Sequence, residues 1–369
     1  MPARPESLSV LLMESLMTFF RELRRLGARL LAPAGVCAVL LTACGGDTSQ
    51  VTSFLPDRVL ALGDENSVIV NDGSNDGFSY TINDRRSATA GKCLAAPIIA
   101  QAVATHYGYA FAECNPKNLT PKAFIHARAG ALIEDPLTGL AAQMASVARL
   151  GPTDLMTVMI GTNDIIALYE RVRSGGLTGG EAIEEAKRLG RSAAVIIGSA
   201  LTTGARALVM TVPDVSLTPY ALKAGKTDSN AGKLLYQMSY DFNGSLRTSI
   251  LPNDGRNFGL VLADDIVAVM QQRPSGYLES PFNVTDAACT TAGVLGCVLT
   301  TDSAGTTLVA GATLASHRLP WNPKPDAASS STMLTYSEWL PSHVVAACRS
   351  AQALMMQKAH ETLETPYSV

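Results

Sequence analysis

Four short apolar runs, each ending at a polar turn, constrain the fold of this chain most strongly. They cover residues 59–62, 155–160, 207–212 and 259–262, and an aspartate follows each: Asp64, Asp164, Asp214 and Asp264. Continuous apolar runs of this length are typical of parallel strands buried on both faces. Helical patterns separate them, at residues 96–106, 137–150, 180–201 and 232–251, so the strands need crossover connections. The order predicts an α/β fold, with a mainly parallel sheet in a three-layer α/β/α sandwich.

Two irregular stretches interrupt this alternation. Residues 67–84 alternate apolar and polar side chains around Asn71-Asp72-Gly73 and Asn75-Asp76-Gly77, which indicates a hairpin inserted after the first strand. Residues 273–332 are rich in Thr, Ser, Gly and Pro and predict a long loop insertion. A final helix is expected over residues 341–365.

The N-terminal segment has the pattern of an export signal. Arg21, Arg24, Arg25 and Arg29 precede an apolar run, residues 30–43, that ends at Cys44. Pro33 and Gly35 interrupt this run, and it is shorter than the roughly 20 residues of a spanning helix, so a transmembrane anchor is the weaker alternative.

The four residues Leu41-Thr42-Ala43-Cys44 resemble the lipobox of bacterial lipoproteins, whose cysteine is acylated and becomes the new N-terminus. This predicts a signal peptide over residues 1–43, a tether over 44–56 and one domain over 57–369. Met1, Met13 and Met17 are alternative starts. We expect an exported protein, held at the bacterial cell envelope by a lipid on Cys44, at the outer membrane or the periplasmic face.

The charge of the chain argues against a nucleic-acid partner. Residues 1–43 hold five basic and three acidic side chains, and without them the formal net charge goes from −3 to −5. A protein that binds a polyanion shows a basic patch, and no local run provides one.

Seven cysteines are present, of which Cys37 leaves with the predicted signal peptide and Cys44 carries the lipid. An oxidising compartment permits disulfides among the other five. The economical pairs are Cys93–Cys114 and Cys289–Cys297, because each closes a short loop, although the sequence leaves the connectivity open. Cys348 is then left over, and it suits a buried, inert thiol.

Residues at the predicted strand ends resemble the ordered blocks of the SGNH/GDSL hydrolase family. The blocks are Gly63-Asp64-Glu65-Asn66-Ser67, then Gly130 within residues 127–131, then Gly161-Thr162-Asn163-Asp164. Residues 212–219 and 282–289 are similar to stretches of its lipase-like branch. The resemblance covers roughly residues 57–360 and implies a flavodoxin-like sheet and action on carboxylic acyl esters. It also implies that Gly130 and Asn163 form the oxyanion hole.

The chain departs from the family pattern at both catalytic positions. Glu65 stands where the family has its nucleophilic serine, and Ser67, two residues on, points to another side. No Asp-x-x-His motif precedes the predicted last helix. His343 is a candidate base there and Glu338 a candidate group to orient it, at a spacing that differs from the motif.

Two interpretations of Glu65 follow. In the structural one, its carboxylate accepts hydrogen bonds from Gly130, Asn163 and a helix N-terminus, which would stabilise the charged form. In the functional one, Glu65 is a general base or a carboxylate nucleophile. The structural interpretation is favoured, because a carboxylate is a poor acyl acceptor.

The strand-end aspartates with Glu65 could also ligate a hard cation, but aspartate is common at helix starts and turns, which accounts for them without a metal. The other histidines have no partner at a telling spacing. We therefore expect no metal and no cofactor.

The sequence supports two functions. The first is an envelope ester hydrolase of SGNH/GDSL type with an altered centre, and it is the one that the family resemblance favours. The second is a catalytically inactive module that binds an acylated or glycan ligand, or a partner protein, at the same strand ends. A plainly structural envelope protein is third.

Overall fold

The computed structural model describes residues 54–80, 83–86, 91–95, 97–250, 257–273, 275 and 297–301. The chain divides into two units, Met1–Ser53 and Phe54–Val369, and all described residues lie in the second. Among them, no helix is both long enough and apolar enough to span a membrane.

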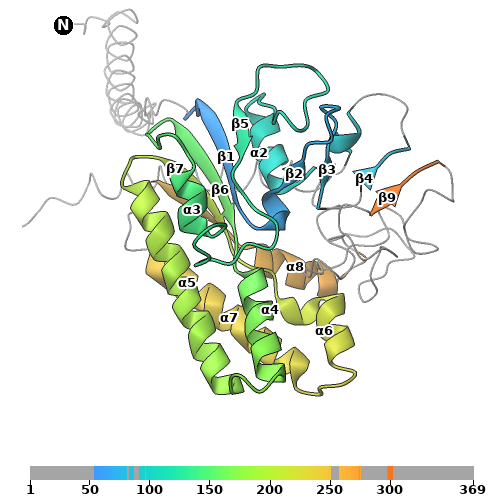
Figure 1. Ribbon diagram of the computed structural model, residues 1–369, viewed down its shortest axis with the longest axis vertical. Coiled ribbons are helices and arrows are strands. Elements are labelled where there is room, and N and C mark those ends of the chain that lie inside the picture. Colours follow the sequence, from blue (N-terminus) through green and yellow to red (C-terminus); the bar gives the residue numbers. More distant parts are fainter. Residues whose placement is uncertain are drawn as a thin grey trace, which may run out of the picture. The chain divides into compact units, whose positions relative to one another are not determined.

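A five-stranded parallel sheet forms the centre of the described part (Figure 1). Its strand order is β5-β1-β6-β7-β8. The third strand in space, β6, pairs with β1 through Met156 opposite Leu60, and with β7 through Met156 opposite Ala207. This order confirms the predicted flavodoxin-like sheet. The bounds are β1 (Arg58–Gly63), β5 (Ala123–Ile125), β6 (Asp154–Met159), β7 (Arg206–Met210) and β8 (Phe258–Val261).

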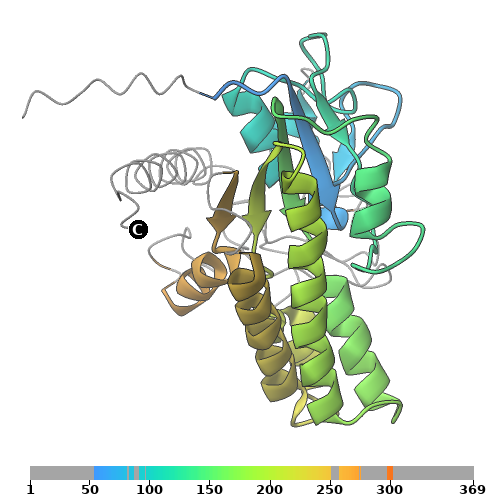
Figure 2. The same ribbon diagram turned by 90° about the vertical axis from the view of Figure 1, so that its left-hand side faces the viewer.

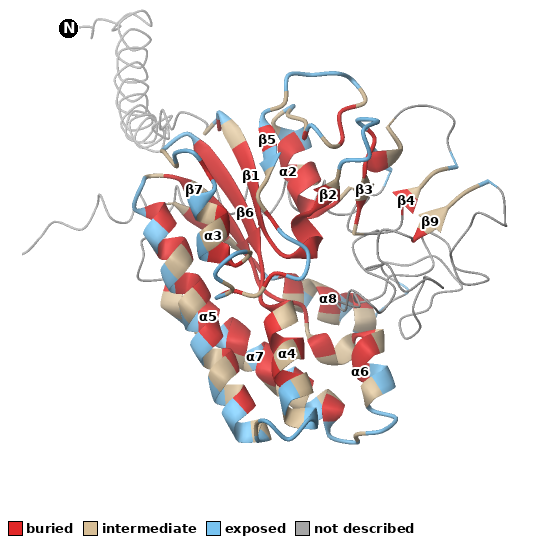
Figure 3. Cartoon of the chain, viewed as in Figure 1, coloured by how far each residue is buried: buried red, intermediate tan, exposed pale blue. Residues whose placement is uncertain are grey.

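Alternate residues of β1 face two different helical layers. Leu60 and Leu62 are fully buried against residues of α4, α5 and α7. Val59 and Ala61, on the opposite face, lie with residues of α2 and α8. Because successive side chains of a strand point to opposite faces, an uninterrupted apolar run is what a sheet covered on both sides requires. The strands β1, β6 and β7 at the centre of the sheet are accordingly buried along nearly their whole length (Figure 3), and the predicted three-layer sandwich is confirmed.

The helices connect the strands in the predicted alternation. The two longest, α5 and α7, lie side by side (Figure 2). The bounds are α2 (Ile99–His106), α3 (Leu140–Ala145), α4 (Thr162–Arg173), α5 (Gly179–Leu201), α6 (Pro219–Ala224), α7 (Ala231–Ile250) and α8 (Ala263–Gln272), with short 3₁₀ turns η1 (Glu65–Ser67), η2 (Lys92–Leu94) and η3 (Val215–Leu217).

Two predicted elements differ from the structure. The helix expected over residues 137–150 is only α3, because Leu137 is 86% exposed and lies within a tight turn closed by the Gly139 N–H and the Asp135 carbonyl. The edge strand β5 was not predicted at all. It has three residues and its central side chain, Phe124, is 39% exposed, so it lacks the buried apolar run that identified the other strands.

The predicted hairpin is present as β2 (Ile69–Val70) paired antiparallel with β3 (Phe78–Ser79). Beyond it, β4 (Asn83–Asp84) pairs with β9 (Val298–Leu299), which lies much later in the chain and belongs to the predicted loop insertion. Most of that insertion, and the helix predicted over residues 341–365, fall outside the described residues.

Candidate functional site

The backbone at the end of β1 is held in a conformation that only glycine adopts easily. Gly63 has φ +121°, and a Cβ there would lie 1.8 Å from the carbonyl oxygen of Met159 on β6. The side-chain amide of Gln143, on α3, accepts from Gly63 N at 2.7 Å and donates to Gly63 O at 2.8 Å. These contacts end β1 and direct the next residues across the carboxyl edge of the sheet.

Asp64 then starts the 3₁₀ turn η1. Its Oδ1 accepts from the backbone N–H of Asn66 at 3.1 Å and from the Asn66 side chain at 2.8 Å. The carboxylate therefore caps the turn, which is the structural role that aspartate commonly has at such positions. Its side chain is fully buried, and Oδ2 has no hydrogen-bond partner among the described residues.

Glu65 lies between the two donors that the sequence singles out. Its Oε2 accepts from Gly130 N at 2.9 Å and from Asn163 Nδ2 at 2.8 Å. Gly130 is in a left-handed turn with φ +73°, and Asn163 is in the first turn of α4. Gly130 and Asn163 follow Glu65 by 65 and 98 positions in the chain, and both donate to the same oxygen atom. The other carboxylate oxygen, Oε1, is buried and has no partner in the part of the chain that the structure describes.

The electrostatics of this carboxylate differ from the expectation. The pKa of Glu65 is raised, because burial outweighs the two hydrogen bonds that favour the charged form. Burial, together with the neighbouring Glu65 charge, also raises the pKa of Asp64 well above its ordinary range. The expected hydrogen bonds from Gly130 and Asn163 are present and favour the charged form, but burial of the carboxylate has the larger, opposite effect on its pKa.

A third buried acid lies at the end of β6. Asp164 accepts from the N–H of Ile133 with both oxygens, at 3.2 and 3.3 Å, yet burial raises its pKa to about 7. The phenol of Tyr80 also has a raised pKa, through burial and through the charge of Glu65. The carboxyl edge of the sheet thus gathers several acids away from solvent.

The remaining strand-end aspartates have structural partners. Asp214 caps η3 by accepting from Ser216 N at 2.8 Å. Asp264 accepts from Thr211 Oγ1 at 2.6 Å and forms an ion pair with Arg247 of α7. Within the described ranges, no group of three or more His, Cys, Asp or Glu side chains is arranged to hold a metal ion.

Neither histidine of the described part contacts Glu65. His126 Nδ1 lies 2.7 Å from Ser146 Oγ, and its pKa is lowered mainly by burial. His106 makes an edge contact with Tyr107. The candidate base His343, its candidate partner Glu338 and the lipidation residue Cys44 lie outside the described residues, so their roles stay predictions.

One of the two predicted disulfides is present. Cys93 and Cys114 are bonded, with their Cα atoms 5.8 Å apart. Cys297 is also disulfide-bonded, while Cys289, its predicted partner, lies outside the described residues.

Sequence reasoning missed Gln143 and Tyr80. Gln143 is 80 residues from the glycine that it holds, and a glutamine inside an Ala-rich helix gives no signal of such a role. Tyr80 directly follows β3 of the inserted hairpin. Apolar and polar residues alternate in this segment, and that pattern indicated only a strand.

Comparison with known proteins bears on the family. No curated protein matches this chain. The model of the GDSL-like lipase/acylhydrolase family matches residues 59–298, which span all five strands of the sheet together with Glu65, Gly130 and Asn163. The match covers more than half of the chain, and the protein therefore belongs to the GDSL-like lipase/acylhydrolase family.

Proposed function

We propose that this family member has lost serine acyl transfer and serves in the cell envelope as a binding module for an acylated or glycan ligand, or for a partner protein. The observation that carries the proposal is the position of Glu65 Oε2, which accepts from both Gly130 N and Asn163 Nδ2. An oxyanion in acyl transfer needs donors at about 2.7–3.1 Å. Here a side chain of the protein already occupies them.

The nucleophile supports the same conclusion. Serine catalysis needs a hydroxyl next to an imidazole that takes its proton. The residue after Asp64 is a carboxylate, and His126 and His106 of the described part are engaged elsewhere. In this proposal the family scaffold supplies a binding surface at the strand ends, and its original chemistry is absent.

A second function, hydrolysis of acyl esters by carboxylate chemistry, is favoured by one observation. Asp64 and Glu65 are adjacent and buried, and each has a raised pKa and one oxygen without a partner in the described part. Two coupled carboxyl groups can hold one proton between them and divide the roles of acid and base. Ionised Glu65 would take a proton from the water that attacks the ester carbonyl, and would return it to the departing alkoxide.

Turnover of p-nitrophenyl acetate and p-nitrophenyl palmitate separates the two functions. The protein is the full-length chain with Cys44→Ser, compared with the same chain carrying Glu65→Gln, which keeps the size of the side chain, or Glu65→Ala. We expect rates at the uncatalysed background for all three. A rate that falls by about a hundredfold or more in Glu65→Gln would support the carboxylate mechanism instead. A rate that survives both substitutions would contradict both functions.

The binding role has its own test. Ligands bound only by the folded state raise the unfolding temperature by mass action. We expect an acylated or glycan envelope component to raise the unfolding temperature of the Cys44→Ser chain without being hydrolysed. A panel of acylated glycans that leaves this temperature unchanged at concentrations up to 10 mM would contradict ligand binding and leave only the partner protein.

A further inference from the structure

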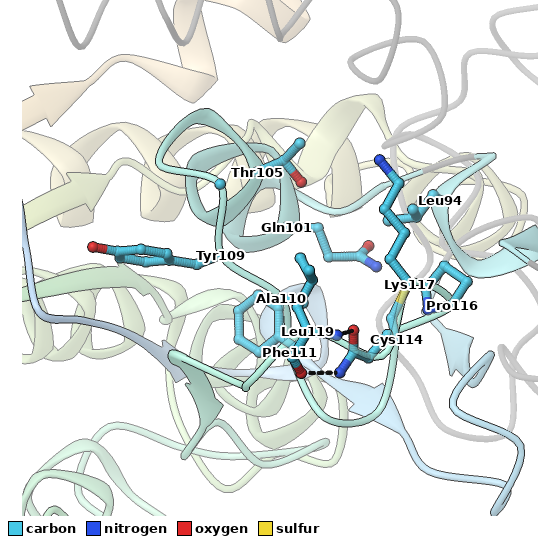
Figure 4. Close-up of a pocket in the computed structure, with 12 residues that line it drawn as sticks. Leu94, Gln101, Thr105, Tyr109, Ala110, Phe111, Cys114, Pro116, Lys117 and Leu119 are labelled. Atoms are coloured by element: carbon cyan, nitrogen blue, oxygen red, sulfur yellow. Dashed lines mark hydrogen bonds between the residues drawn. The ribbon is translucent and has the colours of Figure 1, made fainter.

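A cavity of about 180 Å³ lies between α2 and the loop of residues 107–122 (Figure 4). Its lining does not include Glu65, Gly130 or Asn163. η2 supplies Leu94, α2 supplies Gln101 and Thr105, and the loop supplies the rest. The Cys93–Cys114 disulfide joins η2 to this loop, so the two walls are covalently held.

Two polar side chains of the wall, the amides of Gln101 and Asn115, are hydrogen-bonded to backbone groups. Gln101 accepts from Ile98 N at 2.8 Å and donates to Cys93 O at 3.1 Å. Asn115 accepts from Leu119 N at 2.9 Å and donates to Leu119 O at 2.7 Å. Because these amides already have backbone partners, burying them against a ligand costs less than burying unpaired amides would.

Apolar side chains and a single charge complete the lining. Phe111 is buried, whereas Leu94 and Leu119 are 39% and 43% exposed. Large apolar side chains left open beside a cavity are typical of a ligand site. Lys117 is the one charged residue in the lining, and in the described part its ammonium has no ion pair or hydrogen bond.

We propose that this cavity binds a short aliphatic carboxylate, with the hydrocarbon chain against Leu94, Phe111 and Leu119 and the carboxylate at Lys117. An apolar cavity of about 150 Å³ is large enough for benzene, so this one suits a chain of about six carbons. The charge complementarity at the rim selects an anion over an alcohol or an amine. The site is separate from Glu65 and does not depend on the proposed function.

Calorimetric titration of the full-length Cys44→Ser chain with hexanoate tests the proposal. We expect saturable binding of one hexanoate per chain. Thr105→Phe, which adds bulk from an exposed position of the wall, should weaken binding at least tenfold. Thr120→Phe, the same change at an exposed residue outside the lining, should leave it unchanged.

The charge is tested by a second pair of variants. Lys117→Gln should weaken hexanoate binding about two- to fivefold, the size of an exposed ion pair, whereas Lys233→Gln, a remote lysine on α7, should have no effect. Hexylamine should bind more weakly than hexanoate. Absence of saturable binding, equal binding by Thr105→Phe, or tighter binding of hexylamine would each overturn the proposal. A dimer that Thr105→Phe dissociates, without hexanoate binding, would assign the cavity to a second copy and overturn it too.

Discussion

The buried acids at the carboxyl edge of the sheet are kept at an energetic cost. Within the described ranges, Asp64 and Glu65 each have an oxygen without a partner, and burial disfavours the charged form of both. A buried carboxyl group whose pKa is raised weakens the fold at neutral pH, because ionisation is then harder in the folded chain than in the unfolded one. Such groups are common at functional sites, which is why this edge is the candidate site.

Asp164 makes this cost measurable. Its pKa is raised from 3.8 to about 7, so between these pH values the folded chain holds a proton that the unfolded chain releases. The unfolding free energy should therefore fall as pH rises from about 4 to about 7, by an amount on the order of 4 kcal/mol for this group. Asp164→Asn, which cannot ionise, should lack this fall. Urea unfolding at pH 4, 5, 6 and 7 provides the comparison.

Asp135 offers a control of opposite sign. Its pKa is lowered because the N–H groups of Thr138 and Leu137 donate to it. Its contribution to stability is present above the unfolded pKa and is lost as pH falls. Asp135→Asn should therefore remove a rise of stability with pH, not a fall. Equal slopes for Asp164→Asn and the parent chain would show that Asp164 titrates alike in both states.

At this scale the sequence predicted which residues meet but not their energetics. Gly130 and Asn163 could be assigned because each sits in a recognisable block, and parallel strands bring their carboxyl ends to one edge. The net effect on Glu65 could not be predicted, since it depends on how completely Glu65 is buried. The role of Gln143 likewise depends on a tertiary contact with Gly63 that leaves no local pattern.

At the scale of helices and strands, the packing of α5 against α7 depends on a close approach of the two backbones at Gly190. A Cβ at Gly190 of α5 would lie 2.4 Å from Phe242 O and 3.1 Å from Leu246 N, both backbone atoms of α7. Neither can move without shifting the helix. Gly190→Ala should therefore destabilise the protein by about 1–3 kcal/mol, as overpacking does.

Gly180, in the exposed first turn of the same helix, is the matched position. A Cβ there meets no atom within 4 Å. Gly180→Ala should stabilise the protein by about 0.4–1 kcal/mol, because it restricts the unfolded chain. Urea unfolding of the two variants measures both effects. Equal effects of the two substitutions would mean that the close approach is not maintained in solution.

Strands buried on both faces were the elements that the sequence predicted best. Their apolar runs are uninterrupted because both faces are covered, as the two sets of core residues around β1 show. The edge strand β5 was missed for the opposite reason, since Phe124 faces solvent and the strand is three residues long. The pairing of β4 with β9 could not be predicted either, because no local pattern links two segments so far apart in the chain.

At the scale of the whole molecule, we predict where in the cell the protein is found. If the lipobox-like residues Leu41–Cys44 direct acylation, the native chain should sediment with membranes, and Cys44→Ser should shift most of it to the soluble fraction. Acyl chains contribute about 0.8 kcal/mol per buried methylene, so their loss removes the anchor that we propose. Cell fractionation with mass spectrometry of the N-terminal peptide measures both. A mature, exported chain with unmodified Cys44 would contradict the anchor.

The disulfide between Cys93 and Cys114 also bears on when the cavity is completed during the life of the chain. The reducing cytosol keeps such cysteines as free thiols, so a newly made chain there would lack this disulfide. A disulfide that closes a loop of 21 residues stabilises the folded state by about 3 kcal/mol. The walls of the hexanoate cavity would then be joined only after the chain reaches an oxidising compartment. If the protein is exported and the cavity binds a carboxylate, as we propose, the newly made chain would bind this ligand fully only after export.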